Sequence, residues 1–138
     1  MYLLDTNACI RILNDASPPL IQRLANHVPS EIRLCSIVKA ELLYGARHSQ
    51  RVAENLNILA HFFAPFVSLP FNDRCAEQYG QIRAELVQAG TLIGPNDLLI
   101  AAIARAYELT LVTHNVEEFG RVNGLRLEDW ERVGADAP

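Results

Sequence analysis

Three acidic residues lie beside or within apolar segments of the chain, where a charged side chain is costly. Asp5 directly follows the apolar run 2–4, and Glu41 and Asp97 each have mainly apolar residues three and four positions away, on one helical face. Carboxylates are rarely buried unless they are paired, protonated or bound to a metal ion. The pattern therefore marks Asp5, Glu41 and Asp97 as candidates for a functional site, and it predicts that Glu41 is buried.

A shared pocket for these three acids would have an electrostatic consequence. Two carboxylates about 4 Å apart repel each other by roughly 4 kcal/mol at an effective dielectric constant of 20, so three cannot all stay ionised without a proton or a cation. Oxygen ligands favour Mg²⁺ or Mn²⁺. Such an ion neutralises a phosphate, lowers the pKa of a bound water and stabilises the leaving oxygen. The predicted chemistry is hydrolysis of a phosphodiester bond.

Each acid also has a purely structural explanation. Aspartate is among the preferred residues for capping the start of a helix, and Asp5 precedes a predicted one. Glu41 could form an ion pair with an arginine such as Arg11 or Arg47. Asp97 lies in the first turn of a predicted helix, where the helix dipole stabilises an acid by roughly 0.3–1 kcal/mol. Convergence of all three on one pocket would favour the functional explanation.

The chain beyond residue 112 supplies further candidates. Thr113 and Asn115 could bind a metal-bound water or a phosphate oxygen, and His114 between them adjoins the predicted centre. Glu118 could add a carboxylate through a water molecule, although adjacent acids such as Glu117 and Glu118 at a helix start are commonly a solvated pair. None of the 4 histidines belongs to a His-x-x-x-His pair or lies near a cysteine in sequence, so the spacing does not indicate zinc.

Apolar periodicity predicts alternating strands and helices that would position these side chains. Strands are expected at residues 2–4, 32–35, 66–69, 109–113 and 125–127. Helices are expected at residues 6–13, from 18 to near 29, at 36–46, 49–63 and 73–89, and at 98–107 with Pro95 suited to the first turn. The expected helix caps are Ser17, Ser36, Asn72 or Asp73, and Gly90 at the end of the long helix. This alternation implies right-handed crossovers and a mostly parallel sheet covered on both faces, which is a three-layer α/β domain.

Length and composition exclude several classes of protein. The chain has 138 residues, of which 50% are hydrophobic and 20% charged, so we expect one domain with its own core. The longest apolar run, residues 98–104, is far shorter than the ~18 residues that a membrane span needs, and no signal peptide is recognised. We therefore expect a cytoplasmic protein in which Cys9, Cys35 and Cys75 are buried, reduced thiols. The domain is assigned to residues 1–133, and a frayed tail to residues 134–138.

The net charge of −4 does not favour a simple electrostatic binder of nucleic acid. Of the 12 basic residues, Lys39 is the one lysine, and the rest are arginines, whose planar group binds phosphate and carboxylate through paired hydrogen bonds. Arg11, Arg47, Arg83 and Arg105 are candidates for contact with a substrate or partner. Arginines on helices are, however, more often solvated or paired with glutamate.

Four segments of the chain carry a family resemblance. In order, they are Leu3–Asn7, Ala40–Leu42, Ile93–Ala102 and Thr113–Phe119. This ordered set resembles the motifs of the PIN domain family, and the chain looks like a VapC-type toxin from Met1 to about Trp130. The resemblance implies a PIN-like fold and the toxin of a bacterial toxin–antitoxin pair, acting as a Mg²⁺- or Mn²⁺-dependent endoribonuclease. It also implies a homodimer that is inhibited by a VapB-type antitoxin, whose C-terminal segment occupies the active site.

Matched motif by motif, the resemblance implies that Asp5, Glu41 and Asp97 bind the metal and that Thr6 and Asn115 assist at the same centre. Many PIN nucleases have a fourth acid near the position of Asn115, which leaves the occupancy of a second metal site open. Asparagine is also found there in the VapC branch that this sequence resembles. Members of that branch cut initiator tRNA in its anticodon stem-loop, so the same substrate is implied. Operator DNA would be bound only by the toxin–antitoxin complex.

Other functions remain open from the residues alone. A PIN nuclease that processes DNA or ribosomal RNA would use the same acids and metal. A non-catalytic binding module is disfavoured because all three acids remain. A phosphatase or receiver-like domain could carry an aspartyl-phosphate at Asp5, but it would need a lysine near the phosphoryl group. The available Lys39 lies two residues before Glu41 and so points elsewhere on the helix.

Overall fold

The centre of the protein is a five-stranded parallel sheet with the strand order β3-β2-β1-β4-β5. The structure is a computed structural model that describes residues 1–133, so the predicted tail 134–138 lies outside the described residues. The strands are β1 (Tyr2–Leu4), β2 (Ile32–Cys35), β3 (Val67–Leu69), β4 (Thr110–Val112) and β5 (Arg126–Glu128). The predicted parallel sheet is confirmed.

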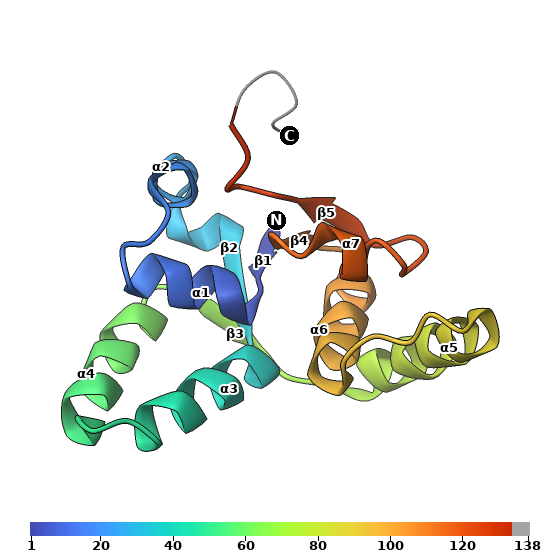
Figure 1. Cartoon of the computed structure of the whole chain (residues 1–138), viewed down its shortest axis with the longest axis horizontal. Helices are drawn as coiled ribbons and strands as arrows, with labels where there is room; N and C mark the ends of the chain where they lie inside the picture. Colours follow the sequence, from blue (N-terminus) through green and yellow to red (C-terminus); the bar gives the residue numbers. More distant parts are fainter. Residues whose placement is uncertain (134–138) are drawn as a thin grey trace.

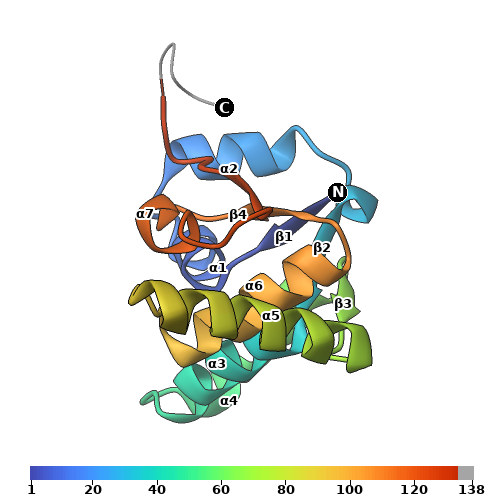
Figure 2. The same ribbon diagram turned by 90° about the vertical axis from the view of Figure 1, so that its right-hand side faces the viewer.

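Helices cover both faces of this sheet. They are α1 (Thr6–Leu13), α2 (Pro18–Ala25), α3 (Ser36–Arg47), α4 (Val52–Phe63), α5 (Asp73–Ala89), α6 (Pro95–Ala106) and α7 (Val116–Phe119), with a 3₁₀ turn at Pro29–Glu31. Figure 1 shows α1, α2 and α4 on one side of the sheet and α5 and α6 on the other. Helix α5 packs along α6, as Figure 2 shows, and α3 contacts α1, α4 and α6. The predicted three-layer α/β architecture is confirmed.

The core lies around the central strand and the most apolar helix. Leu3 and Leu4 of β1 are fully buried, and α6 has buried residues at nearly every position from Leu98 to Ala106. A parallel sheet needs apolar cover on both faces, which explains why this helix lacks the polar stripe of a surface helix. Near the other end of the chain, Trp130 is 1% exposed and stacks on His27 with ring centroids 5.0 Å apart. The C-terminal segment is therefore held against the first third of the chain.

The strand order places one edge of the sheet where ligands commonly bind. The chain leaves β1 toward β2 on one side, whereas β4 pairs with β1 on the other side. In open parallel sheets, the crevice beyond the carboxyl ends of the strands at such a reversal is the usual ligand site. Asp5 follows β1 directly, and Thr113 follows β4 directly, so both lie at this reversal.

Several predicted helix ends differ from the structure. Ser17 occupies the cap position of α2 without a capping hydrogen bond, and α2 ends at Ala25 rather than near Pro29. Ser36 is the first residue of α3 and not its cap, because Cys35 at the end of β2 keeps an extended backbone up to the helix. Other bounds shift by one to three residues, as is usual where ends fray.

Two capping predictions for the long helix α5 are confirmed. The side chain of Asn72 accepts a hydrogen bond from the backbone N–H of Cys75, and Gly90 ends the helix with φ of +70°. Glycine adopts this left-handed conformation without the steric cost that other residues pay.

The predicted buried thiols and the expected lack of a membrane span can also be compared with the structure. Cys9, Cys35 and Cys75 are all buried and form no disulfide. Among residues 1–133, no helix is long and apolar enough to span a bilayer.

Candidate active site

A polar pocket of about 330 Å³ opens at the carboxyl ends of the central strands. Its lining residues are Asp5, Thr6, Asn7, Ile10, Glu41, Asp97, Asn115 and Phe119. The pocket therefore brings together all three acids and both assisting residues singled out from the sequence, from segments as far apart as β1 and α7. Their spatial convergence is a property of the structure, while their roles in catalysis stay a prediction.

Asp5 combines a structural and a chemical role. Its side chain is buried, and Oδ1 accepts a hydrogen bond of 2.7 Å from the backbone N–H of Ala8, so it caps α1 as the structural explanation predicts. Burial raises the pKa of Asp5 to about 6, and the negative charges of Glu131 and Glu41 add to this effect. Hydrogen bonds from Thr113 and Ala8 act in the opposite direction. The cap thus holds in place a carboxyl group that can take up a proton near neutral pH.

Glu41 reaches the pocket from α3 and is held by a hydrogen bond from Thr6. The Thr6 hydroxyl donates to Glu41 Oε1 at 2.7 Å. The prediction that Glu41 is buried is wrong, because the side chain is only half-buried and its helical neighbour Tyr44 is 69% exposed. Within residues 1–133, no ion pair reaches Glu41, so the structure does not support the alternative of a pair with Arg11 or Arg47.

Asp97 and Glu118 face each other across the start of α6. Burial, followed by the charge of Glu118, raises the pKa of Asp97 to about 7. Glu118 Oε1 accepts from the backbone N–H of Gly94 at 2.9 Å, and Oε2 accepts from the Asn115 side chain at 2.7 Å. The Gly94 hydrogen bond is the main cause that lowers the pKa of Glu118. Of the two acids, Asp97 is therefore the one that takes up a proton more readily, and its protonated carboxyl group donates a hydrogen bond to Glu118.

Glu118 is not the solvated acid that its neighbour Glu117 is. Glu117 is exposed, whereas Glu118 is half-buried and bonded to two segments of the site. Glu118 contacts Asn115 and Asp97 directly, and its contribution of a carboxylate through water stays a prediction.

The pocket has the donor set of a site for a hard cation. Three carboxylates line it, and in the described part of the chain no lysine or arginine does. Oxygen donors of this kind suit Mg²⁺ or Mn²⁺. Burial, with smaller contributions from neighbouring negative charges, raises the pKa of Asp5 and of Asp97, and a bound cation would favour the ionised form of both. An aspartyl-phosphate site is not supported, because Lys39 places its ammonium over the ring of Phe63, 4.7 Å from the centroid.

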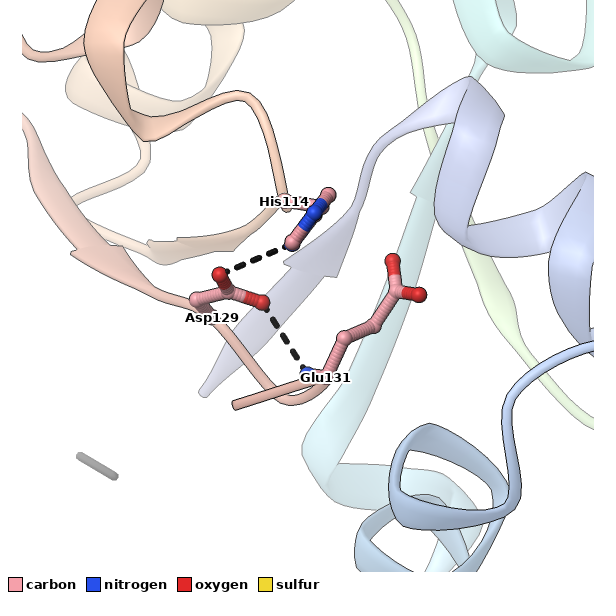
Figure 3. Close-up of side chains that lie close together, drawn as sticks. All are labelled: His114, Asp129 and Glu131. Atoms are coloured by element: carbon pink, nitrogen blue, oxygen red, sulfur yellow. Dashed lines mark hydrogen bonds and ion pairs between the residues drawn. The ribbon is translucent and has the colours of Figure 1, made fainter. Parts of the chain in front are cut away.

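The sequence analysis missed a second polar cluster beside this pocket, formed by His114, Asp129 and Glu131 (Figure 3). His114 Nδ1 lies 2.9 Å from Asp129 Oδ2, and Glu131 is close enough to raise the pKa of Asp5. Glu131 is 126 positions from Asp5 in the sequence, and no motif or periodicity links the two. Only the pairing of β5 with β4 brings the end of the chain to this edge of the sheet.

Comparison with known proteins agrees with the fold. The family model for the PIN domain matches residues 2–125. Ribonuclease VapC2 of Rickettsia felis is 40% identical over 135 residues, which are 96% of this chain and 99% of that protein. The tRNA(fMet)-specific endonuclease VapC of Shigella flexneri is 39% identical over 129 residues, which are 94% of this chain and 97% of that protein.

Solved structures of related complexes have the same fold. In VapBC2 from Rickettsia felis bound to a DNA fragment from the promoter, the matching chain has a TM-score of 0.87 and 39% identity, over 94% of this chain and 98% of that one. In DNA-bound VapBC from Salmonella typhimurium, the matching chain has a TM-score of 0.88 and 36% identity, over 94% of this chain and 97% of that one. The chain belongs to the PIN domain family and, within it, to the VapC ribonucleases.

Proposed function

We propose that this chain is the toxin of a VapBC toxin–antitoxin pair and acts as an endoribonuclease that depends on Mg²⁺ or Mn²⁺. The observation that carries the proposal is the pocket in which Asp5, Glu41 and Asp97 converge without a lysine or arginine among the described lining residues. A polyanionic substrate can approach such a pocket only when a cation offsets the negative charge.

The five lining residues singled out from the sequence each have a proposed role. Asp5, Glu41 and Asp97 would hold the metal, which supplies charge neutralisation of the phosphate and a bound water of lowered pKa. The Thr6 hydroxyl orients Glu41 through its hydrogen bond. Asn115 orients Glu118, which in turn controls the proton on Asp97. Residues that orient metal ligands in this way typically change metal affinity or activity by 10–100-fold when they are replaced.

The proposed substrate is initiator tRNA, cut in its anticodon stem-loop. This proposal is supported by the relatives from Shigella flexneri and Salmonella typhimurium, which are named tRNA(fMet)-specific endonucleases and are each 39% identical to this chain. Sequencing of the new ends after incubation with total tRNA and Mg²⁺ should show one dominant cut in that loop. Scattered cuts across many tRNAs would contradict this substrate.

The proposed partners follow from the solved VapBC complexes. A VapB-type antitoxin would inhibit the enzyme by placing its C-terminal segment in the pocket, and the complex would bind operator DNA, as the related complexes are bound to DNA. We also infer a homodimer that acts in the cytoplasm.

The experiment that tests the activity compares cleavage of purified RNA pools in Mg²⁺, in Mn²⁺ and in EDTA. The wild type should cut in either metal and not in EDTA, and Asp5→Asn should not cut in any condition. Glu117→Gln is the matched control, because it removes an exposed acid of α7 outside the pocket and should cut like the wild type. Cleavage of DNA but not RNA would identify a different PIN nuclease, and no cleavage at all would favour a binding module.

A further inference from the structure

A second pocket, of about 570 Å³, adjoins the acidic one. Its lining residues are Asn7, Ile10, Arg11, His114, Asn115 and Glu131. Three of these, Asn7, Ile10 and Asn115, also line the acidic pocket, so the two pockets are neighbours that share a wall. The unit of an extended chain that follows the one in the acidic pocket would therefore lie beside the second pocket.

The two pockets differ in the charge that they can carry. Within the part of the chain that the structure describes, Arg11 and His114 are the lining residues that can bear a positive charge, and both belong to the second pocket. The chain as a whole has a net charge of −4, so attraction for a polyanion must come from local groups such as these.

Arg11 is fixed in the second pocket by an ion pair. Its Nε donates to Glu131 Oε1 at 2.5 Å, and its side chain remains 44% exposed, whereas that of Glu131 is only 10% exposed. A guanidinium has five N–H donors in a rigid plane, so Arg11 keeps donors beyond the two that bond Glu131 and the Ala16 carbonyl oxygen. Because Glu131 offsets part of the charge, we expect Arg11 to act mainly through directed N–H donors.

His114 is oriented by a buried carboxylate. Asp129 is 4% exposed, and its Oδ2 lies 2.9 Å from His114 Nδ1, while its Oδ1 accepts from the backbone N–H of Glu131 at 3.0 Å. An ionised carboxylate can only accept, which assigns the proton to Nδ1 and turns Nε2 outward. The imidazole is 66% exposed and is therefore available to a ligand.

These contacts do not favour a metal ion among His114, Asp129 and Glu131, although one ligand atom from each lies within 4.8 Å of the others. Asp129 already bonds His114 and the Glu131 backbone, and the Glu131 carboxylate reaches toward α1, where it pairs with Arg11 (Figure 3). A cation would have to displace the Arg11 guanidinium. The cluster is instead arranged to orient two nitrogen groups toward the pocket.

We propose that Arg11 and His114 bind the RNA phosphate next to the one that is cleaved, an inference that rests on the proposed ribonuclease activity. The scissile phosphate occupies the acidic pocket, and the chain crosses the wall shared at Asn115. The neighbouring phosphate then accepts hydrogen bonds from Arg11 and from Nε2–H of the His114 imidazolium, the form in which Nδ1–H also bonds Asp129. Asp129 is a positioning residue that acts through His114.

The test measures RNA binding separately from cleavage. A fluorescently labelled initiator tRNA anticodon stem-loop is titrated with Asp5→Asn protein in Mg²⁺ at several salt concentrations. Adding Arg11→Gln or His114→Gln should weaken binding about tenfold, as loss of a charged hydrogen bond does. The two substitutions together should reduce the slope of log K against log salt by about 0.7, the value for one phosphate on a single strand. Arg51→Gln is the control, because Arg51 is exposed, pairs with Glu54 at the start of α4 and lines neither pocket.

Three further measurements distinguish the loss of a phosphate contact from a loss of folding. Thermal unfolding identifies any loss of stability in Arg11→Gln, and His114→Gln alters a largely exposed side chain. Asp129→Asn should reproduce the loss seen in His114→Gln and should add little when the two are combined, because both act on one contact. In a stem-loop with a neutral methylphosphonate beside the cleaved bond, Arg11→Gln and His114→Gln should have no further effect.

The outcomes separate this inference from the proposed function. If the wild type cuts RNA but neither variant changes the affinity or the salt slope, the proposed ribonuclease activity is supported and the proposed phosphate site is wrong. The same holds if the variants change only inhibition by the antitoxin. If no cleavage occurs while both variants lose affinity and slope, the pocket binds RNA phosphate and the proposed hydrolysis is wrong.

Discussion

Replacing Asp5 with asparagine should stabilise the metal-free protein above neutral pH while abolishing cleavage. The side chain is 4% exposed, and its burial raises the pKa from 3.8 to about 6. Because a change of one in pKa corresponds to about 1.36 kcal/mol, the ionised carboxylate costs the native state about 3 kcal/mol at pH values above 6. Asparagine caps helices as well as aspartate does, so the hydrogen bond from Ala8 is retained while this cost disappears.

The sign of the pH dependence follows from the direction of the Asp5 pKa. The folded protein holds the proton more tightly than the unfolded chain, so the stability that Asp5 contributes is present below pH 3.8 and is lost as the pH rises through about 6. The melting temperatures of wild type and Asp5→Asn should therefore be similar near pH 4. They should separate by as much as about 10 °C at pH 8, since 1 kcal/mol shifts the Tm of such a domain by roughly 3–4 °C.

The assay is thermal unfolding in EDTA, followed by circular dichroism at pH 4, 6 and 8. Mg²⁺ should then raise the wild-type stability by roughly 2.7 kcal/mol at a hundredfold excess over Kd, and should raise that of Asp5→Asn by less. The control Glu117→Gln should follow the wild type at every pH. The reasoning is refuted if Asp5→Asn is less stable than the wild type at pH 8 without metal, or if the difference does not change with pH.

Substitutions at four other residues test the site and the core. Glu41→Gln should lower kcat by more than the roughly 10–100-fold that is typical of an orienting residue. The free energy of unfolding should change by less than about 0.5 kcal/mol, because Glu41 has no ion pair in residues 1–133. A sharp loss of stability would show a structural role. Thr6→Val should lower kcat by roughly 10–100-fold and Thr6→Ser should restore it, since only the hydroxyl bonds Glu41. Glu118→Gln removes a negative charge that raises the pKa of Asp97, so the acid limb of the pH–rate profile should move to lower pH; an unchanged limb would contradict the coupling. Trp130→Ala should cost about 3–5 kcal/mol in urea unfolding, and a cost below 1 kcal/mol would contradict its place in the core.

Much of the fold and the meeting of the three acids can be predicted from the sequence, because both follow from local patterns and one rule of sheet geometry. Asp5 comes directly after a buried strand, and parallel strands end at one common edge. Once the strands were placed, Asp5 and Thr113 had to lie near each other. The burial of Glu41 could not be predicted correctly, because apolar neighbours such as Tyr44 can line an open groove as well as a core.

The remaining parts of the site depend on contacts between distant segments. Glu118 accepts a hydrogen bond from the backbone N–H of Gly94, 24 residues away. Every residue except proline has such an N–H, so the sequence does not indicate this contact. Glu131 reaches Asp5 and Arg11 only because the chain returns along β5 after more than a hundred residues. Sequence patterns indicate which face of a single helix or strand is apolar. They do not indicate which distant segment packs against that face.

The central position of β1 has a consequence for the synthesis of the protein. Leu4 pairs with Val112 of β4, so the first strand made stays without its second neighbour until most of the chain has left the ribosome. The pocket likewise draws on Asp5 at the start of the chain and Asn115 near its end. A nascent or truncated chain therefore lacks part of the acidic centre and the strand that shapes it. The acidic centre is therefore complete only after the chain has been made as far as Asn115.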